Sequence, residues 1–232
     1  MMIFTKKPSN PSISTVTTPA IDVAAPTQTE TATFALGWFW GPDSQFGSLP
    51  GVVRTRVGYT GGKKRNPTYH SLGDHTETLQ IDYDPTRISY EALLEIFWDN
   101  HNPTRRSWSK QYMAALFYHN DTQQELALAS KERQAVKRNQ QISTEVIPAT
   151  EFYLAEDYHQ KYMLRQTAEL MTEFSAFYPN PKDFVNSTAA ARVNGYVSGY
   201  GAIAQLQDEL AWLGLSARGG QRLLELARRY HQ

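Results

Sequence analysis

The sequence predicts an α+β domain in which helices pack on a mixed β-sheet. Short segments with alternating or apolar residues are interspersed with longer amphipathic segments, which is typical of strands and helices that share one layered domain. Of the 232 residues, 41% are hydrophobic and 12% are aromatic, so the chain can build a sizeable core. This length suits one domain of ordinary size with additional terminal segments.

Five segments have the pattern of β-strands. The first is a short apolar run that ends at Gly37, the second alternates Val with Arg and Thr and ends at Gly61-Gly62, and the third ends at Asp84-Pro85. Glycine and proline interrupt regular structure, so they mark the ends of these strands. The expected strands cover residues 33–36, 52–59, 76–83, 112–118 and 142–148.

Helices are expected between and after these strands. The first begins at Pro42-Asp43, because proline has the backbone angle of a first helical turn and an acidic residue is favoured there. Ser89 is expected to cap the next helix, since its hydroxyl can accept a hydrogen bond from a free backbone N–H. The longer helices are expected over residues 89–98, 122–139 and 155–174.

The two ends of the chain are expected to lie outside the α+β domain. The N-terminal stretch is rich in Ser, Thr and Pro and poor in long apolar side chains, which predicts a disordered tail. The C-terminal stretch has leucines at helical spacing and predicts two helices with Gly219-Gly220 between them, after a linker at residues 179–187. The predicted boundaries are 1–30 for the tail, 31–175 for the domain and 188–232 for the helical C-terminal extension.

Charge and hydropathy narrow the range of partners. The chain has 23 Lys and Arg against 23 Asp and Glu, so its formal charge is zero and nothing indicates binding to nucleic acid or to an anionic membrane. No apolar run approaches the roughly 18–20 residues of a membrane helix. We expect a monomer in the cytoplasm. The Ser/Thr-rich and acid-poor start leaves an organellar transit segment open as an alternative.

The sequence contains no cysteine. A chain of this composition has no disulfide, no thiolate metal site and no thiol nucleophile. Six histidines are present without the spacing of a zinc motif, so no metal site is expected. His75 and His101 are instead expected to fix loops through hydrogen bonds.

A run of aromatic residues marks the candidate site. In the sequence Gly37-Trp38-Phe39-Trp40-Gly41, a strand ends, glycine allows a sharp turn, and a helix begins. Backbone N–H groups at a helix N-terminus favour negative charge, and a cysteine at such a place would have a lowered pKa. On composition alone, three consecutive aromatic residues favour a piece of hydrophobic core over a site.

The wider pattern resembles a known family. Its blocks are Gly37–Gly41, Arg56–Gly62, Asn66–Tyr69, His75–Glu77, Tyr83–Pro85, Phe97-Trp98, His101–Thr104, Gln111-Tyr112 and Glu156–Tyr162. On these blocks, residues 31–164 resemble the peptide-methionine (S)-S-oxide reductases, the type A methionine sulfoxide reductases, which repair oxidised methionine.

The resemblance implies a two-layer α+β sandwich and an oxidoreductase that acts on methionine (S)-sulfoxide in proteins. In the family, a thiolate at the position of Trp38 attacks the sulfoxide sulfur, and the carboxyl matching Glu77 supplies a proton to the departing oxygen. Acid assistance at oxygen makes the sulfur more electrophilic. No bound cofactor is implied, and an external thiol reductant such as thioredoxin or dithiothreitol restores the enzyme. The residues matching Tyr69 and Tyr112 bind the oxygen, and those matching Phe39 and Trp40 hold the methyl group.

The chain departs from the family pattern at the nucleophile. An indole has no nucleophilic group that ionises near neutral pH, so Trp38 predicts that turnover is absent in the chain as written. Ser107 also replaces the family's Asp, Asp43 replaces Glu, and the loop at residues 105–110 differs from the family's Gly- and Asp-containing loop. One alternative is a non-catalytic module that binds a sulfoxide or peptide. A second is a selenocysteine enzyme whose UGA codon is rendered as Trp38, and a third is a scaffold that uses residues 188–232.

Overall fold

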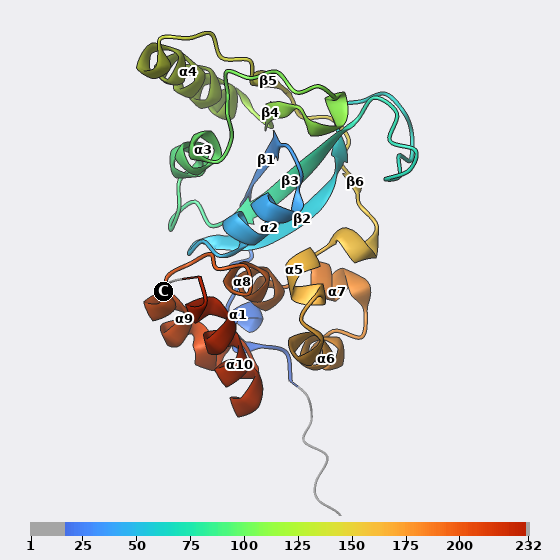
Figure 1. Ribbon diagram of the computed structural model, residues 1–232, viewed down its shortest axis with the longest axis vertical. Coiled ribbons are helices and arrows are strands. Elements are labelled where there is room, and N and C mark those ends of the chain that lie inside the picture. Colours follow the sequence, from blue (N-terminus) through green and yellow to red (C-terminus); the bar gives the residue numbers. More distant parts are fainter. Residues whose placement is uncertain (1–16, 231–232) are drawn as a thin grey trace, which may run out of the picture.

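The computed structural model describes residues 17–230, and the structural statements below concern that part of the chain. Six strands form one sheet in the order β5-β4-β1-β3-β2-β6 (Figure 1). Strands β4 and β5 run parallel and every other pair is antiparallel, which confirms the predicted mixed sheet. The strands are β1 (Glu30–Leu36), β2 (Val52–Thr60), β3 (Thr76–Tyr83), β4 (Ala114–Tyr118), β5 (Glu145–Pro148) and β6 (Tyr153–Leu154).

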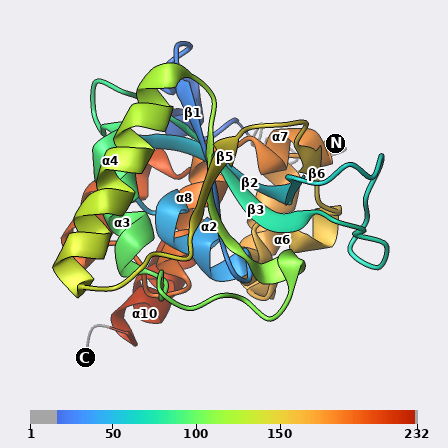
Figure 2. The same ribbon diagram turned by 90° about the horizontal axis from the view of Figure 1, so that it is seen from above.

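Three helices from the part of the chain before residue 140 pack on the sheet. Helix α2 (Trp40–Gly47) contacts β2 and β3, α3 (Tyr90–Asp99) contacts β1, and α4 (Asp121–Arg138) contacts β4 and β5. Figure 2 shows α3 and α4 side by side. The predicted cap is confirmed, because the Ser89 hydroxyl accepts a hydrogen bond from Ala92 N at 3.2 Å. A 3₁₀ turn, η1 (Lys110–Tyr112), leads into β4.

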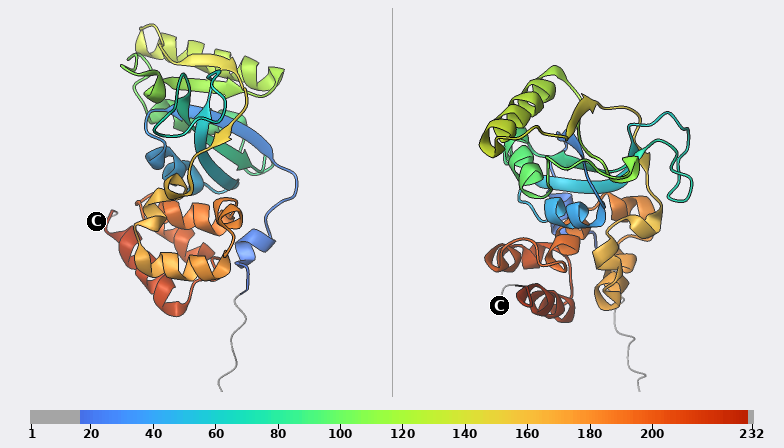
Figure 3. Two further views of the ribbon diagram at one scale, coloured as in Figure 1. Left: turned by 90° about the vertical axis from the view of Figure 1, so that its right-hand side faces the viewer. Right: turned by 45° about the horizontal axis from the view of Figure 1, so that its top comes forward.

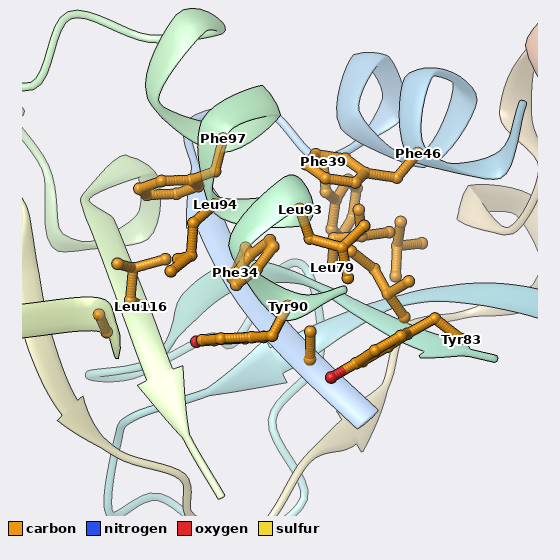
Figure 4. Close-up of a cluster of buried hydrophobic side chains, with 14 of the residues drawn as sticks. Phe34, Phe39, Phe46, Leu79, Tyr83, Tyr90, Leu93, Leu94, Phe97 and Leu116 are labelled. Carbon is orange, nitrogen blue, oxygen red and sulfur yellow. The ribbon is translucent and has the colours of Figure 1, made fainter. Parts of the chain in front are cut away.

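A hydrophobic core fills the space between the sheet and these helices. Phe34 of β1 and Leu79 of β3 point toward Leu93 and Phe97 of α3, and all four side chains are fully or almost fully buried (Figure 4). The rings of Phe34 and Phe97 lie 5.2 Å apart at a tilted angle. Burial of such side chains stabilises the fold by about 1.5–3 kcal/mol each. This core holds β1, and therefore the turn that follows it, in a fixed position.

The remaining helices form a second layer, which we call the helical unit. It consists of α1 (Ala20–Val23), η2 (Asp157–His159), α5 (Tyr162–Arg165), α6 (Ala168–Phe177), α7 (Pro181–Val185), α8 (Thr188–Tyr196), α9 (Ile203–Glu209), η3 (Leu210–Trp212) and α10 (Ala217–Arg228). A second hydrophobic cluster holds these helices together, with Phe174, Val193 and Leu223 among its fully buried members. Figure 3 shows the helical unit below the sheet and its helices, against α2.

The single helix expected over residues 155–174 is divided into η2, α5 and α6. The break follows from two tertiary contacts. The Gln160 side chain accepts a hydrogen bond from Val57 N at 3.1 Å and donates one to Val57 O at 2.8 Å, which attaches this segment to the sheet like a further strand. Lys161 then adopts a left-handed backbone conformation with φ +51°, and a right-handed α-helix cannot continue through a residue in this conformation. Long-range bonds therefore override the helical periodicity.

The terminal segments also differ from expectation. Residues 17–30 contain α1, where the sequence predicts a disordered tail. The Asp22 carboxylate holds this helix in place by accepting hydrogen bonds from Ala189 N at 3.0 Å and Ser187 Oγ at 2.9 Å. Residues 1–16 of the predicted tail lie outside the described residues. The predicted linker contains α7, and Gly219-Gly220 lie inside α10, not between two helices.

None of the described helices combines the length and apolar character that a bilayer-spanning segment needs.

The crossing of α2 and α8 depends on glycine. A Cβ atom added at Gly195 would lie 2.6 Å from Ser44 O and 2.6 Å from Ser48 Cβ, too close for any side chain. We expect Gly195→Ala to lower the free energy of unfolding by about 1–3 kcal/mol, because the two helices must move apart. Urea unfolding followed by circular dichroism measures this change. Gly41→Ala is the control, since nothing lies within 4 Å of a Cβ there, and an equal loss in both variants would contradict the prediction.

Candidate active site

The candidate site forms where the central strand ends. Strand β1 lies between β3 and β4, and its last residue is followed by Gly37 with φ +94°, an angle that favours glycine. Trp38 and Phe39 follow, and α2 begins at Trp40. This confirms the predicted succession of strand, glycine turn and helix. Strand β3 runs antiparallel to β1, and the last residue pair between them is Phe34 with Leu79. Glu77 lies two residues before Leu79 in β3 and is therefore beside the turn that follows β1.

The predicted site residues lie around one cavity of about 100 Å³. Its lining is formed by Trp38, Phe39, Trp40, Tyr69, Glu77 and Tyr112. These residues come from the β1–α2 turn, the β2–β3 loop, β3 and η1. The three consecutive aromatic residues do not form one piece of core, because Phe39 is buried whereas the Trp38 side chain is 66% exposed. The arrangement therefore favours a pocket.

Glu77 is the acidic group of this pocket and is only 3% exposed. Its Oε1 accepts a hydrogen bond from Gln111 Nε2 at 2.9 Å, and its Oε2 accepts one from Phe39 N at 3.4 Å. Burial raises the pKa of the Glu77 carboxyl in spite of these two donors. The group can therefore keep a proton at a pH where an exposed glutamate has lost it.

The two tyrosines reach the cavity from separate elements. Tyr69 lies in the β2–β3 loop, and its backbone N donates to Glu156 Oε1 at 3.0 Å. Glu156 Oε2 also accepts a hydrogen bond from Tyr59 OH at 2.7 Å, so this carboxylate fastens the loop to β2. Desolvation raises the pKa of Tyr112, which keeps its hydroxyl able to donate. Sequence reasoning assigned no role to Glu156, although it belongs to the last family block.

His159 positions the wall of the pocket. Its Nδ1 accepts a hydrogen bond from Trp40 Nε1 at 3.2 Å, and desolvation lowers the pKa of His159 so that the ring stays neutral. On its other side Trp40 stacks on Tyr162 with ring centroids 3.9 Å apart. The indole of Trp40 is thus held between two elements that follow β6.

A buried ion pair supports the helix below the pocket. Lys161 Nζ lies 3.1 Å from Asp43 Oδ1 of α2 and donates to Thr55 O at 2.6 Å, and both charged side chains are fully buried. Asn194 of α8 donates to Asp43 Oδ2 at 3.3 Å. Asp43 therefore connects α2 to the sheet and to the helical unit. Local sequence patterns assign Asp43 only the role of a residue in the first turn of a helix.

His75 and His101, the two histidines expected to fix loops, form hydrogen bonds to nearby backbone groups. His75 Nε2 donates to Lys64 O at 2.7 Å while its Nδ1 accepts from Gly62 N at 3.2 Å, and His101 Nδ1 donates to Phe97 O at 2.8 Å. Among residues 17–230, no group of three or more His, Cys, Asp or Glu side chains is placed to hold a metal ion.

The fold and the pocket together define a class of protein. An aromatic cradle suits a thioether methyl group, and a buried carboxyl with a raised pKa beside two hydroxyl donors suits a polarised S–O bond. The family described as "Peptide methionine sulfoxide reductase" matches residues 30–191. The family described as "Selenoprotein methionine sulfoxide reductase A, helical domain" matches residues 180–223. The chain belongs to the peptide methionine sulfoxide reductase family, as the resemblance indicated.

Individual relatives agree with this assignment. The chain is 43% identical over 192 residues to a peptide methionine sulfoxide reductase of Drosophila melanogaster, which covers 80% of this chain and 75% of that protein. It is 41% identical over 181 residues to peptide methionine sulfoxide reductase A5 of Oryza sativa, covering 75% and 70%.

Solved structures confirm the fold. The structure of methionine sulfoxide reductase A of Corynebacterium diphtheriae has a TM-score of 0.54 and 32% identity, covering 62% of this chain and 77% of that chain. Reduced Mxr1 from Saccharomyces cerevisiae has a TM-score of 0.57 and 28% identity, covering 62% and 88%.

Proposed function

We propose that this protein reduces methionine (S)-sulfoxide in peptides and proteins, and that the attacking atom is the selenium of a selenocysteine at position 38. The observation that carries the proposal is the buried, protonatable Glu77 beside the turn that bears residue 38. Burying an ionisable carboxyl is unfavourable for folding, and it is typical of sites where the proton is used. The aromatic residues and the two tyrosines of the pocket line the same cavity as Glu77. The group that the pocket lacks is a nucleophile.

A family match within the helical unit supports selenocysteine, and not cysteine, at position 38. Residues 180–223 match the helical domain described for selenoprotein members of the family. In this chain the matched segment packs on α2 through α8, and α2 is the helix that follows residue 38. The codon for selenocysteine is UGA, which differs from the tryptophan codon in one base. A translation that renders UGA as tryptophan would give the sequence printed here.

The proposed reaction transfers one oxygen atom. The selenolate at position 38 attacks the sulfoxide sulfur while Glu77 protonates the sulfoxide oxygen, which gives a selenium–sulfur bond and an S–OH group. The hydroxyl oxygen then bonds to selenium as the S–O and Se–S bonds break, and the products are a selenenic acid and a thioether. Selenium is oxidised and sulfur is reduced by two electrons. Tyr69 and Tyr112 donate hydrogen bonds to the oxygen, and Phe39 and Trp40 contact the methyl group.

The return of the selenenic acid to the selenol needs an outside reductant. The chain has no cysteine that could form an internal selenenyl sulfide. Two thiols of an external dithiol therefore react in turn, giving the selenol, a disulfide and water. Thioredoxin and dithiothreitol are the reductants that we propose for this step.

The test compares the natural protein with variants at position 38. We expect a UGA codon in the transcript, and the selenium isotope pattern in the mass spectrum of the peptide that contains residue 38. With dithiothreitol and a methionine sulfoxide peptide, Trp38→Cys is expected to exceed the Trp38 chain by at least about 10³-fold in turnover, because removing a nucleophile has effects of that order. A UGG codon with tryptophan in the natural protein, or turnover by the Trp38 chain itself, would contradict the proposal.

A second candidate function is a non-catalytic module that binds sulfoxides. It is favoured by the position of the indole, since the Trp38 ring lies 6.4 Å from that of Trp40 and 6.3 Å from that of Tyr112 and so adds an aromatic wall at the pocket mouth. For this function the natural protein must contain tryptophan. Calorimetry should then show tighter binding of a methionine sulfoxide peptide than of its methionine counterpart, and weaker binding after Glu77→Gln.

A further inference from the structure

A groove lies directly beside the catalytic pocket. Its volume is about 370 Å³, and it is formed by the turn at Gly37 and the loop that leads from α3 to η1, with Arg105, Arg106 and Trp108 in its wall. Tyr112 lines both the groove and the pocket. A peptide whose sulfoxide enters the pocket therefore has an adjacent place for the residues next to it.

The charged side chains that line this groove, Arg105 and Arg106, are both positive. Arg105 and Arg106 are exposed, and their side chains form no ion pair within residues 17–230. No carboxylate lines the groove along the part of the chain that the structure describes. Two unpaired guanidinium groups at a concave surface favour a carboxylate ligand, which they can bind through paired hydrogen bonds.

The groove also offers an apolar platform. The Trp108 side chain is 85% exposed, and its ring lies 5.7 Å from that of Tyr112. A large exposed indole next to a binding pocket is typical of a contact surface for a ligand.

We propose that this groove selects substrates in which acidic residues flank the methionine sulfoxide. Arg105 and Arg106 bind the flanking carboxylates, and Trp108 covers the peptide between them and Tyr112. This inference rests on the proposed function, and it names the substrate class of the same site. A peptide is favoured over a nucleic acid because Tyr112 lines both the groove and the pocket and the chain as a whole has no net charge.

Binding of labelled peptides to the full-length protein tests the proposal independently of turnover. Fluorescence anisotropy compares peptides in which methionine sulfoxide has two Asp, two Asn or two Lys on each side. We expect the Asp peptide to bind about ten-fold more tightly than the Asn peptide at low salt, with the difference shrinking as ionic strength rises. The Lys peptide is expected to bind most weakly.

Charge reversal identifies the residues responsible. Arg105→Glu with Arg106→Glu is expected to abolish or invert the preference for the Asp peptide, while binding of the Asn peptide changes little. Arg228→Glu with Arg229→Glu makes the same change of charge at the end of α10, where both residues are exposed, and should leave the preference intact. Equal binding of the Asp and Asn peptides, or equal effects of the two double variants, would overturn the proposal.

Two additional ligands distinguish the pocket from the groove and a peptide from a nucleic acid. An Asp peptide with methionine in place of the sulfoxide tests the pocket, since equal binding of both would contradict the proposed function while leaving the charge preference measurable. A single-stranded oligothymidylate competitor tests the groove as a nucleic-acid site. If it displaces the Asp peptide at lower concentration than the unlabelled peptide does, the proposed substrate class is wrong.

Discussion

Replacing Glu77 by Gln should lower the rate of sulfoxide reduction by about 10²–10⁴-fold, the usual contribution of a positioned proton donor. The amide keeps the size of the side chain, and its single oxygen can accept from one of the two donors of the carboxyl, Gln111 Nε2 and Phe39 N, but it has no acidic proton to give. The measurement is single-turnover reduction of a methionine sulfoxide peptide in the Trp38→Cys background or in the selenoprotein.

The pH dependence gives this prediction a second readout. Only the protonated carboxyl can donate, so the rate is expected to fall as the pH rises through the raised pKa of Glu77. The same shift contributes to stability below the unfolded-state pKa, and this contribution is lost as the pH rises through the folded-state pKa. Glu77→Gln should remove that limb of the rate profile. Glu91→Gln, at an exposed position of α3, is the control, and an unchanged limb in Glu77→Gln would exclude Glu77 as the donor.

The replacement of Lys161 by Met is expected to cause the largest loss of stability, about 3–5 kcal/mol, because it leaves the Asp43 carboxylate buried without its cation. Lys161 and Asp43 are fully buried at 3.1 Å, and Thr55 bonds to both. Chemical denaturation followed by fluorescence gives the change in free energy of unfolding.

An exposed ion pair provides the control for Lys161→Met. Arg133 and Glu95 lie 3.9 Å apart on α4 and α3 with more than half of each side chain exposed. Arg133→Met should therefore change stability by less than about 1 kcal/mol. Combining Lys161→Met with Asp43→Asn should destabilise the fold by less than the sum of the single changes, because the uncompensated charge is gone. Additive losses would show that the pair is not coupled.

Local patterns in the sequence predicted most of the sheet but missed β6, and the family blocks named the residues around the pocket. Alternation predicted β2 and β3 with almost correct ends, and the cap at Ser89 fixed the start of α3. The family blocks identified all six residues that line the cavity. These features depend on neighbours in the sequence, or on motifs that keep their spacing.

The features that could not be predicted depend on contacts between distant residues. Gln160 bonds to Val57 across more than a hundred residues, and no periodicity marks such a bond. Glu156 and His159 position Tyr69 and Trp40 from the same segment. Residues 17–30 are held in place by Asp22, which accepts hydrogen bonds from Ser187, just before α8, and from Ala189 in α8. Composition alone indicates only that this segment has few apolar residues.

The central position of β1 affects how the protein is made. A ribosome that stops at codon 38 releases the middle strand of the sheet and the short α1, while both neighbouring strands, β3 and β4, are still untranslated. Such a fragment has nothing to pair with and is expected to be degraded. If codon 38 is UGA, selenium supply therefore sets how many folded molecules a cell holds, and each molecule that folds already carries its reactive atom.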